Sequence, residues 1–151
     1  MVTIEEFKKK QSDKTRLVGL DLGSKRIGVS ISDDRQSIAT PFKTINKTNT
    51  NDLINELKKI ITEYNIKGII VGNPVNMSGS IGRSAQSVND VASNISKSIN
   101  LPVILWDERL STVGAFNLSS QLDINVTKRV KTIDQNAAAF ILQGALDYLN
   151  N

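Results

Sequence analysis

Three acidic residues stand where elements of a folded domain would end or begin. Asp21 interrupts the apolar stretch 17–23, and Glu108 ends a second apolar stretch directly after Asp107. A carboxylate inside such a stretch costs several kcal/mol unless cations or hydrogen bonds compensate it. Asp134 precedes the apolar positions of the last segment, where it could instead cap a helix. If the three carboxylates meet, their mutual repulsion requires cations.

Cations bound by carboxylate oxygens alone are hard ions, here Mg²⁺ or Mn²⁺. Two such ions, about 3.5–4 Å apart, can activate a water molecule on one side of a phosphodiester and stabilise the leaving oxygen on the other. The composition agrees with this chemistry, because the sequence contains no His and no Cys. Their absence excludes a Ser-His-Asp triad, a thiolate nucleophile and any metal site built on imidazole or thiolate ligands.

Spacing alone does not decide which acid accompanies Asp21. Asp107 and Glu108 point to opposite faces of an extended strand, so at most one of them is expected beside Asp21. Structural interpretations are also open for each acid. Asp21 could accept hydrogen bonds from the turn that follows it, and the adjacent pair could form an ion pair with Arg109.

Apolar periodicity predicts the elements that must position these acids. Three strands joined by tight turns, and therefore antiparallel, come first, at 17–23, 27–32 and 36–45. The elements that follow are a helix capped by Asn51, a strand at 67–72, a helix after the loop 73–82, a strand at 102–107, a short helix at 112–121 capped by Ser111 and a helix from near Asp134. This order predicts an α/β, ribonuclease-H-like fold, a mixed five-stranded sheet of three antiparallel strands and then two crossover strands, with helices on both faces. Ligands gather where the parallel strands of such sheets end.

Length and charge bound the remaining possibilities. The 151 residues suit a single domain, which we place at 17–151 behind a polar N-terminal extension at 1–16. Nineteen Lys and Arg against 15 Asp and Glu leave a net charge of +4. This balance permits a nucleic-acid partner and equally suits a charge that only keeps the protein soluble. No export signal or membrane span is visible, so we expect a cytoplasmic protein without a membrane partner.

Four stretches resemble the YqgF/RuvX family, bacterial pre-16S rRNA nucleases that are also described as Holliday-junction-resolvase-like. They are GLDLGSKRIGVSISD (19–33), GIIVGNPVNMSG (68–79), WDERLST (106–112) and KTIDQNAAAFILQGALDYL (131–149). The resemblance covers 17–149 and implies a metal-dependent endonuclease that processes the 5′ end of 16S rRNA.

The resemblance also implies site residues. It makes Asp21, Glu108 and Asp134 the catalytic and metal-binding carboxylates, which favours Glu108 over Asp107. In the loop 73–82, after the strand at 67–72, the family usually carries an acid where this chain has Ser78. We therefore expect that loop to contact substrate and not metal.

Basic residues near these acids are candidates for nucleic-acid binding, and each could equally be a solvated or ion-paired side chain. They are Lys25 and Arg26 after Asp21, Arg83 at the start of the second helix, Arg109 after Glu108, and Lys128, Arg129 and Lys131 in a predicted polar loop at 122–132. Aromatic residues make up only 5% of the chain, and Trp106 and Phe140 are predicted to lie in the core. Recognition would therefore use phosphates and shape, with a salt-dependent affinity, and not base stacking.

The expected partner is a structured nucleic acid, with a ribosomal RNA precursor favoured over a DNA junction and a pre-30S ribosomal particle as a further candidate. A monomer and a homodimer are both compatible with the sequence. Three alternative functions stay open: a resolvase of four-way DNA junctions, a non-catalytic ribosome assembly factor, and an ATPase. The last alternative arises because residues 21–25 also resemble the first phosphate motif of actin-like and sugar-kinase ATPases, although those proteins need two lobes.

Overall fold

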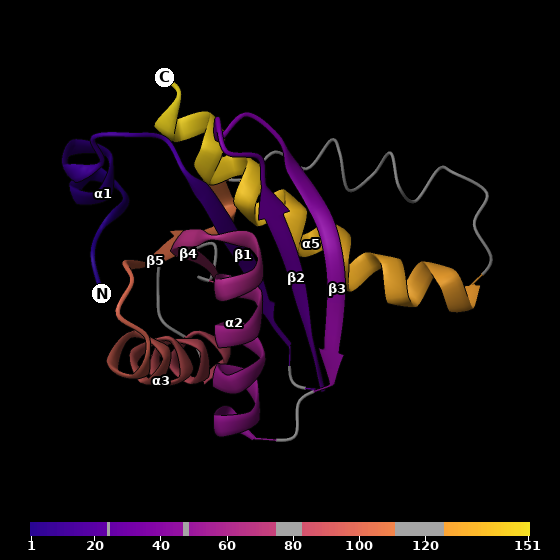
Figure 1. Cartoon of the computed structure of the whole chain (residues 1–151). Coiled ribbons are helices and arrows are strands. Elements are labelled where there is room, and N and C mark those ends of the chain that lie inside the picture. The colour runs from indigo at the N-terminus through magenta and orange to yellow at the C-terminus, as the bar shows by residue number, and fades with distance from the viewer. Residues whose placement is uncertain (24, 47–48, 75–82, 111–125) are drawn as a thin grey trace.

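The first three strands form an antiparallel meander, and two further strands extend it as parallel neighbours (Figure 1). The computed structural model describes residues 1–23, 25–46, 49–74, 83–110 and 126–151, with the backbone alone for 83–85, 109 and 126–134. The sheet has the order β3-β2-β1-β4-β5. Its strands are β1 Arg16–Leu22, β2 Arg26–Ser32, β3 Ala39–Asn46, β4 Ile66–Asn73 and β5 Val103–Asp107. This arrangement confirms the predicted mixed five-stranded sheet.

Helices cover both faces of the sheet and create two apolar cores. Helices α2 (Thr50–Tyr64) and α3 (Arg83–Ser98) pack on one face. Helices α1 (Ile4–Lys10) and α5 (Val126–Leu149) pack on the other. In Figure 1, α2 lies in front of the sheet and α5 crosses behind it. We call these the α2/α3 face and the α5 face.

Strand β1 shows how alternation distributes its residues between the two faces. Val18 and Leu20 belong to the core under α2 and α3, whereas Leu17 belongs to the core under α5. Because side chains alternate along a strand, Gly19 and Asp21 share the α5 face with Leu17. A Cβ atom on Gly19 would lie only 2.9 Å from the carbonyl oxygen of Ala138 in α5. The missing side chain therefore lets α5 lie close against the strand that carries Asp21.

The N-terminal residues, predicted as a polar extension, form a helix that packs on the domain. Thr3 caps α1 by accepting a hydrogen bond from the Glu6 amide at 3.1 Å. Ile4 and Phe7 are buried in the core under α5. Val2 forms a parallel bridge with Ile104 and so covers part of the outer edge of β5. The two apolar residues, one helical turn apart, explain why this charged segment folds onto the sheet.

Several predicted boundaries were wrong. Asn49 caps α2, by accepting from the Asp52 amide at 2.9 Å, and not Asn51. The third strand begins at Ala39 and not at 36. The last helix begins at Val126, so the predicted loop 122–132 is helical over its described part. The predicted short helix 112–121 with its cap Ser111, and Ser78 in the 73–82 loop, lie outside the described residues.

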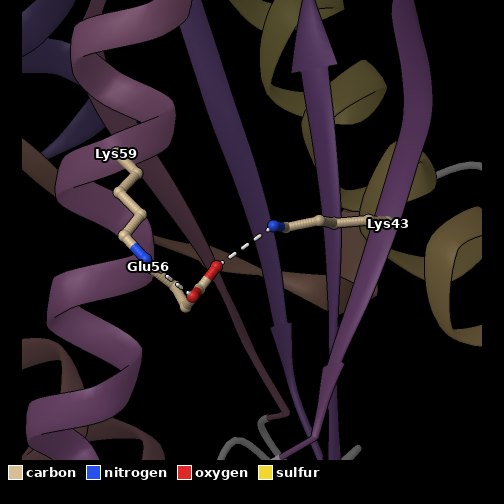
Figure 2. Close-up of polar contacts among 3 residues, drawn as sticks. All are labelled: Lys43, Glu56 and Lys59. Atoms are coloured by element: carbon tan, nitrogen blue, oxygen red, sulfur yellow. Dashed lines mark hydrogen bonds and ion pairs between the residues drawn. The ribbon is translucent and has the colours of Figure 1, made fainter.

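One charged contact joins the meander to the helix that follows it. Glu56 of α2 accepts a hydrogen bond from the Lys43 ammonium group of β3 at 3.1 Å, and Lys59 lies 3.5 Å from its other oxygen (Figure 2). The hydrogen bond and charge of Lys43, then the charge of Lys59, lower the pKa of Glu56. Such exposed pairs contribute little to stability, so burial of its apolar residues in the core of the α2/α3 face must hold α2 in place.

Replacement of Phe7 tests whether the N-terminal helix is part of the folded unit. We expect Phe7→Ala to lower the free energy of unfolding by about 3 kcal/mol, the usual cost of truncating a buried phenylalanine. Urea denaturation measures the change. The exposed Lys9→Ala on the same helix is the control, expected within about 0.5 kcal/mol of the parent. Equal stability of the two variants would show that α1 does not contribute to the core.

Candidate active site

Two of the predicted acids meet at the end of the sheet where β1, β4 and β5 terminate. Asp21 is the penultimate residue of β1, and Glu108 opens a short 3-10 helix, η1 (Glu108–Leu110), directly after β5. Both are partly buried. Glu108 lies on the α5 face, which Asp21 occupies on β1, because its carboxyl carbon is 3.3 Å from the Cβ position of Gly72, and Gly72 shares that face with Ile70. Strand β4, which separates β1 from β5, lies between the two acids.

The pKa of Glu108 reflects its burial and its acidic neighbours. Burial raises the pKa of Glu108 to about 7, with the negative charge of Asp21 as the next cause and that of Asp107 as the third. Each cause disfavours the ionised carboxylate. A raised carboxyl pKa caused by burial and a second acid is typical of functional sites, and also of sites that await a cation.

Asp107, the last residue of β5, lies on the opposite face of the sheet from Glu108. By alternation it follows Val103 and Leu105 onto the α2/α3 face, in register with Asn73 at the end of β4. The side-chain oxygen of Asn73 is buried without a hydrogen-bond partner among the described residues. Asn73 is thus a buried polar residue at this end of the sheet that sequence reasoning missed, and it lies on the face opposite to Asp21 and Glu108. Its position at the end of a buried strand, next to a loop, was the available signal.

The backbone of α5 brings the third predicted acid toward the same end of the sheet. Gln135, which follows Asp134, donates a hydrogen bond to Thr44 of β3 at 3.3 Å. Thr44 is in register with Gly28 of β2, and Gly28 with Asp21. Asp134 lies eight residues after Val126, inside the helix, so the N-cap interpretation was wrong. The side chain of Asp134 lies outside the described part of the chain.

Two of the seven predicted basic residues can be placed in full. Lys25, in the turn between β1 and β2, and Arg26, the first residue of β2, are exposed and close in sequence to Asp21. The side chains of the other five fall outside the described residues: Arg83, Arg109, Lys128, Arg129 and Lys131. Three of these, predicted to lie in a loop, have backbones inside α5.

The paired acids fit a hard divalent cation. Asp21 and Glu108 supply carboxylate oxygens, the ligands that Mg²⁺ and Mn²⁺ prefer. Their mutual repulsion is the condition that a cation relieves. Within the described side chains, no group of three or more potential metal ligands is found.

Taken together, the strand order and the acids at the strand ends are those of the ribonuclease-H-like nuclease class. The sequence model of the RuvX family, described as "Holliday junction resolvase", matches residues 15–148. A protein of Pelagibacter ubique named "Putative pre-16S rRNA nuclease" is 83% identical over 151 residues, the whole of both chains. A protein of the same name from Rhodobacter capsulatus is 47% identical over 133 residues, 88% of this chain and 84% of that one. The chain therefore belongs to the RuvX family and is a nuclease.

Solved structures support the fold independently. RuvC of T. thermophilus, solved with a Holliday junction substrate, matches with a TM-score of 0.56 and 10% identity over 89% of this chain and 94% of that one. The yeast mitochondrial Holliday junction resolvase Ydc2 matches with a TM-score of 0.54 and 12% identity over 97% and 84%. At such identities the likeness concerns the fold alone. No helix in the described ranges is long and apolar enough to cross a membrane.

The raised pKa of Glu108 predicts how stability depends on pH in metal-free solution. With a native pKa of about 7 and an ordinary value of 4.5, the native state retains a proton that the unfolded state loses. Stability therefore falls as the pH rises through this window. We expect Glu108→Gln to be more stable than the parent at pH 8, by on the order of 1 kcal/mol after discounting for solvent screening.

Urea denaturation in EDTA at pH 4.5 and pH 8 measures this difference, which should shrink at the lower pH. The exposed Glu63→Gln on α2 serves as the control and should show no such pH-dependent gain. A parallel response of the two variants would contradict the burial of charge at Glu108.

Proposed function

We propose that the chain is a divalent-metal-dependent endonuclease that cleaves a phosphodiester bond of structured RNA and processes the 5′ end of the 16S rRNA precursor. The observation that carries the proposal is the meeting of Asp21 and Glu108 on the α5 face, where β1 and β5 end. The names of the two relatives support the choice of substrate. Such a substrate implies a cytoplasmic location and a pre-30S particle as partner.

In the proposal, Asp21, Glu108 and Asp134 hold two Mg²⁺ or Mn²⁺ ions. When bound, these ions supply an activated water molecule and charge neutralisation at the leaving oxygen. The chain's own task is to keep carboxylates together despite their repulsion. Because burial and Asp21 raise the pKa of Glu108 to about 7, cation binding competes with a proton at this residue.

Cationic side chains around the acids would hold the phosphate backbone. Lys25, in the turn that follows β1, and Arg26, the first residue of β2, are exposed. We extend the same role to Arg83 at the start of α3, Arg109 in η1, and Lys128, Arg129 and Lys131 in α5. Contacts of this kind position a nucleic acid without reading its sequence. Binding would therefore depend on RNA shape and on salt.

A cleavage assay on precursor 16S rRNA with Mg²⁺ or Mn²⁺ tests the catalytic assignment. We expect Asp21→Asn and Glu108→Gln each to lower kcat by roughly 10³-fold or more, as loss of an essential catalytic group does. Asp107→Asn, which changes the neighbouring acid on the opposite face, should retain most of the activity. Chelation by EDTA should abolish cleavage and excess Mg²⁺ should restore it.

Two results would redirect the proposal. Cleavage of a four-way DNA junction in preference to the RNA precursor would identify the chain as a junction resolvase. Tight RNA binding without cleavage, unchanged in Asp21→Asn, would identify a non-catalytic assembly factor.

A charge variant tests the phosphate contacts. We expect Lys25→Gln to raise KM without changing kcat, and to reduce the slope of log affinity against log salt by about 0.7–0.9, the contribution of one phosphate contact. Lys97→Gln, an exposed lysine in the last turn of α3, is the matched control, because that turn precedes the opposite end of β5. Equal salt slopes for Lys25→Gln and Lys97→Gln would remove Lys25 from the interface.

A further inference from the structure

We infer that Gly72 of β4 is a positioning residue, whose missing side chain lets the carboxyl group of Glu108 lie over the sheet beside Asp21. The inference rests on the proposed role of Glu108. Gly72 itself touches no reacting group. It acts through the acid that it admits.

The space above Gly72 is occupied by two other residues. A Cβ atom built on Gly72 would lie 3.3 Å from the carboxyl carbon of Glu108 and 2.4 Å from the terminal methyl carbon of Ile141. Carbon atoms in good contact are separated by about 3.5–4.0 Å. Even an alanine at this position would therefore press on both side chains. One comes from η1 and the other from α5.

The register of the sheet explains why this one position matters. Leu20 is in register with Val71, so Asp21 and Gly72 are the next positions along β1 and β4. Gly72 is in turn paired with Trp106 of β5, two residues before Glu108. β4 lies between β1, which carries Asp21, and β5, which Glu108 follows directly (Figure 1). A side chain on the α5 face at position 72 would stand between Asp21 and Glu108.

The alternative is a purely structural role, in which position 72 must be glycine only because Ile141 occupies the space above it. The two roles separate in a double variant. Ile141→Val removes the Cδ1 atom that a new Cβ would meet at 2.4 Å, but keeps Cγ1, which the Cβ of Gly72→Ala would meet at 3.0 Å. Swaps that conserve volume are tolerated best in cores. The double variant Gly72→Ala/Ile141→Val thus relieves the severe clash and leaves the pressure on Glu108 together with one apolar contact at 3.0 Å, which Gly68→Ala reproduces at 2.9 Å against Leu17.

A second glycine of the same strand provides a matched control. Gly68 lies four residues earlier on the same face, where a Cβ atom would meet Leu17 at 2.9 Å and the Phe7 ring at 3.4 Å. Gly68→Ala therefore adds the same atom to the same strand against apolar neighbours only. It measures the general cost of a side chain on this face of β4.

The experiment compares the double variant, Gly68→Ala and Glu108→Gln with the parent. Urea denaturation, Mn²⁺ titration calorimetry of the metal-free protein and kcat and KM for the RNA precursor are measured for each. We expect the double variant to match Gly68→Ala in stability, to bind Mn²⁺ about 10-fold or more weakly, and to lose 10–100-fold in kcat at unchanged KM, in the range known for residues that position metal ligands. Gly68→Ala should keep the parent's Mn²⁺ affinity and kcat.

Parental Mn²⁺ affinity and kcat in the double variant would overturn the inference, because position 72 would then serve packing alone. The result for Glu108→Gln separates this failure from that of the proposed function. If Glu108→Gln itself keeps full Mn²⁺ affinity and kcat, the proposed catalytic role falls. A crystal structure of the double variant then decides the inference without activity: a carboxyl group displaced from Asp21 supports it, and an unmoved one refutes it.

Discussion

Close approach between α5 and the sheet is the constraint on which the rest of the structure depends. The helix crosses β3, β2, β1 and β4 on one face. It can do so because Gly19 presents no side chain, and because the buried hydroxyl of Ser30 donates to the carbonyl oxygen of Ala138 at 2.8 Å. That hydrogen bond satisfies a hydroxyl which would be costly to bury alone. The same approach brings the backbone around Asp134 toward the end of the sheet that carries Asp21.

At that end, the fold holds charges together in a way that opposes its own stability. Glu108 faces burial and two neighbouring acids, and its pKa is raised to about 7. A protein under selection for stability alone would replace such a group, since proteins retain strained electrostatics mainly where function uses them. At the same end of the sheet lies the buried side-chain oxygen of Asn73, which has no hydrogen-bond partner among the described residues. The sheet and its two cores provide the rigid support that this arrangement requires.

The accuracy of the sequence predictions followed the strength of the local signal. The buried strands were predicted nearly to the residue, because a short, continuous apolar run bounded by turn residues is typical of a buried strand. The start of α5 was missed, since residues 126–132 carry three cations and only two apolar residues, Val126 and Val130, whose helical spacing is a weak signal. Helix α1 was also missed as part of the core. Its two buried residues, Ile4 and Phe7, make too short a pattern to stand out in a charged segment.

The sequence by itself determined that any site must work without His and Cys, and it placed acids at strand ends. It also determined the order of the elements and, by resemblance, the family. Strand spacing could not show which of Asp107 and Glu108 lies on the same face as Asp21. Nor could it show that the absence of a side chain at Gly72 leaves room for Glu108 above β4. Those features depend on which residues of β1, β4, β5 and α5 become neighbours. Contacts between segments so distant in the chain leave no local pattern, so only the tertiary structure decided them.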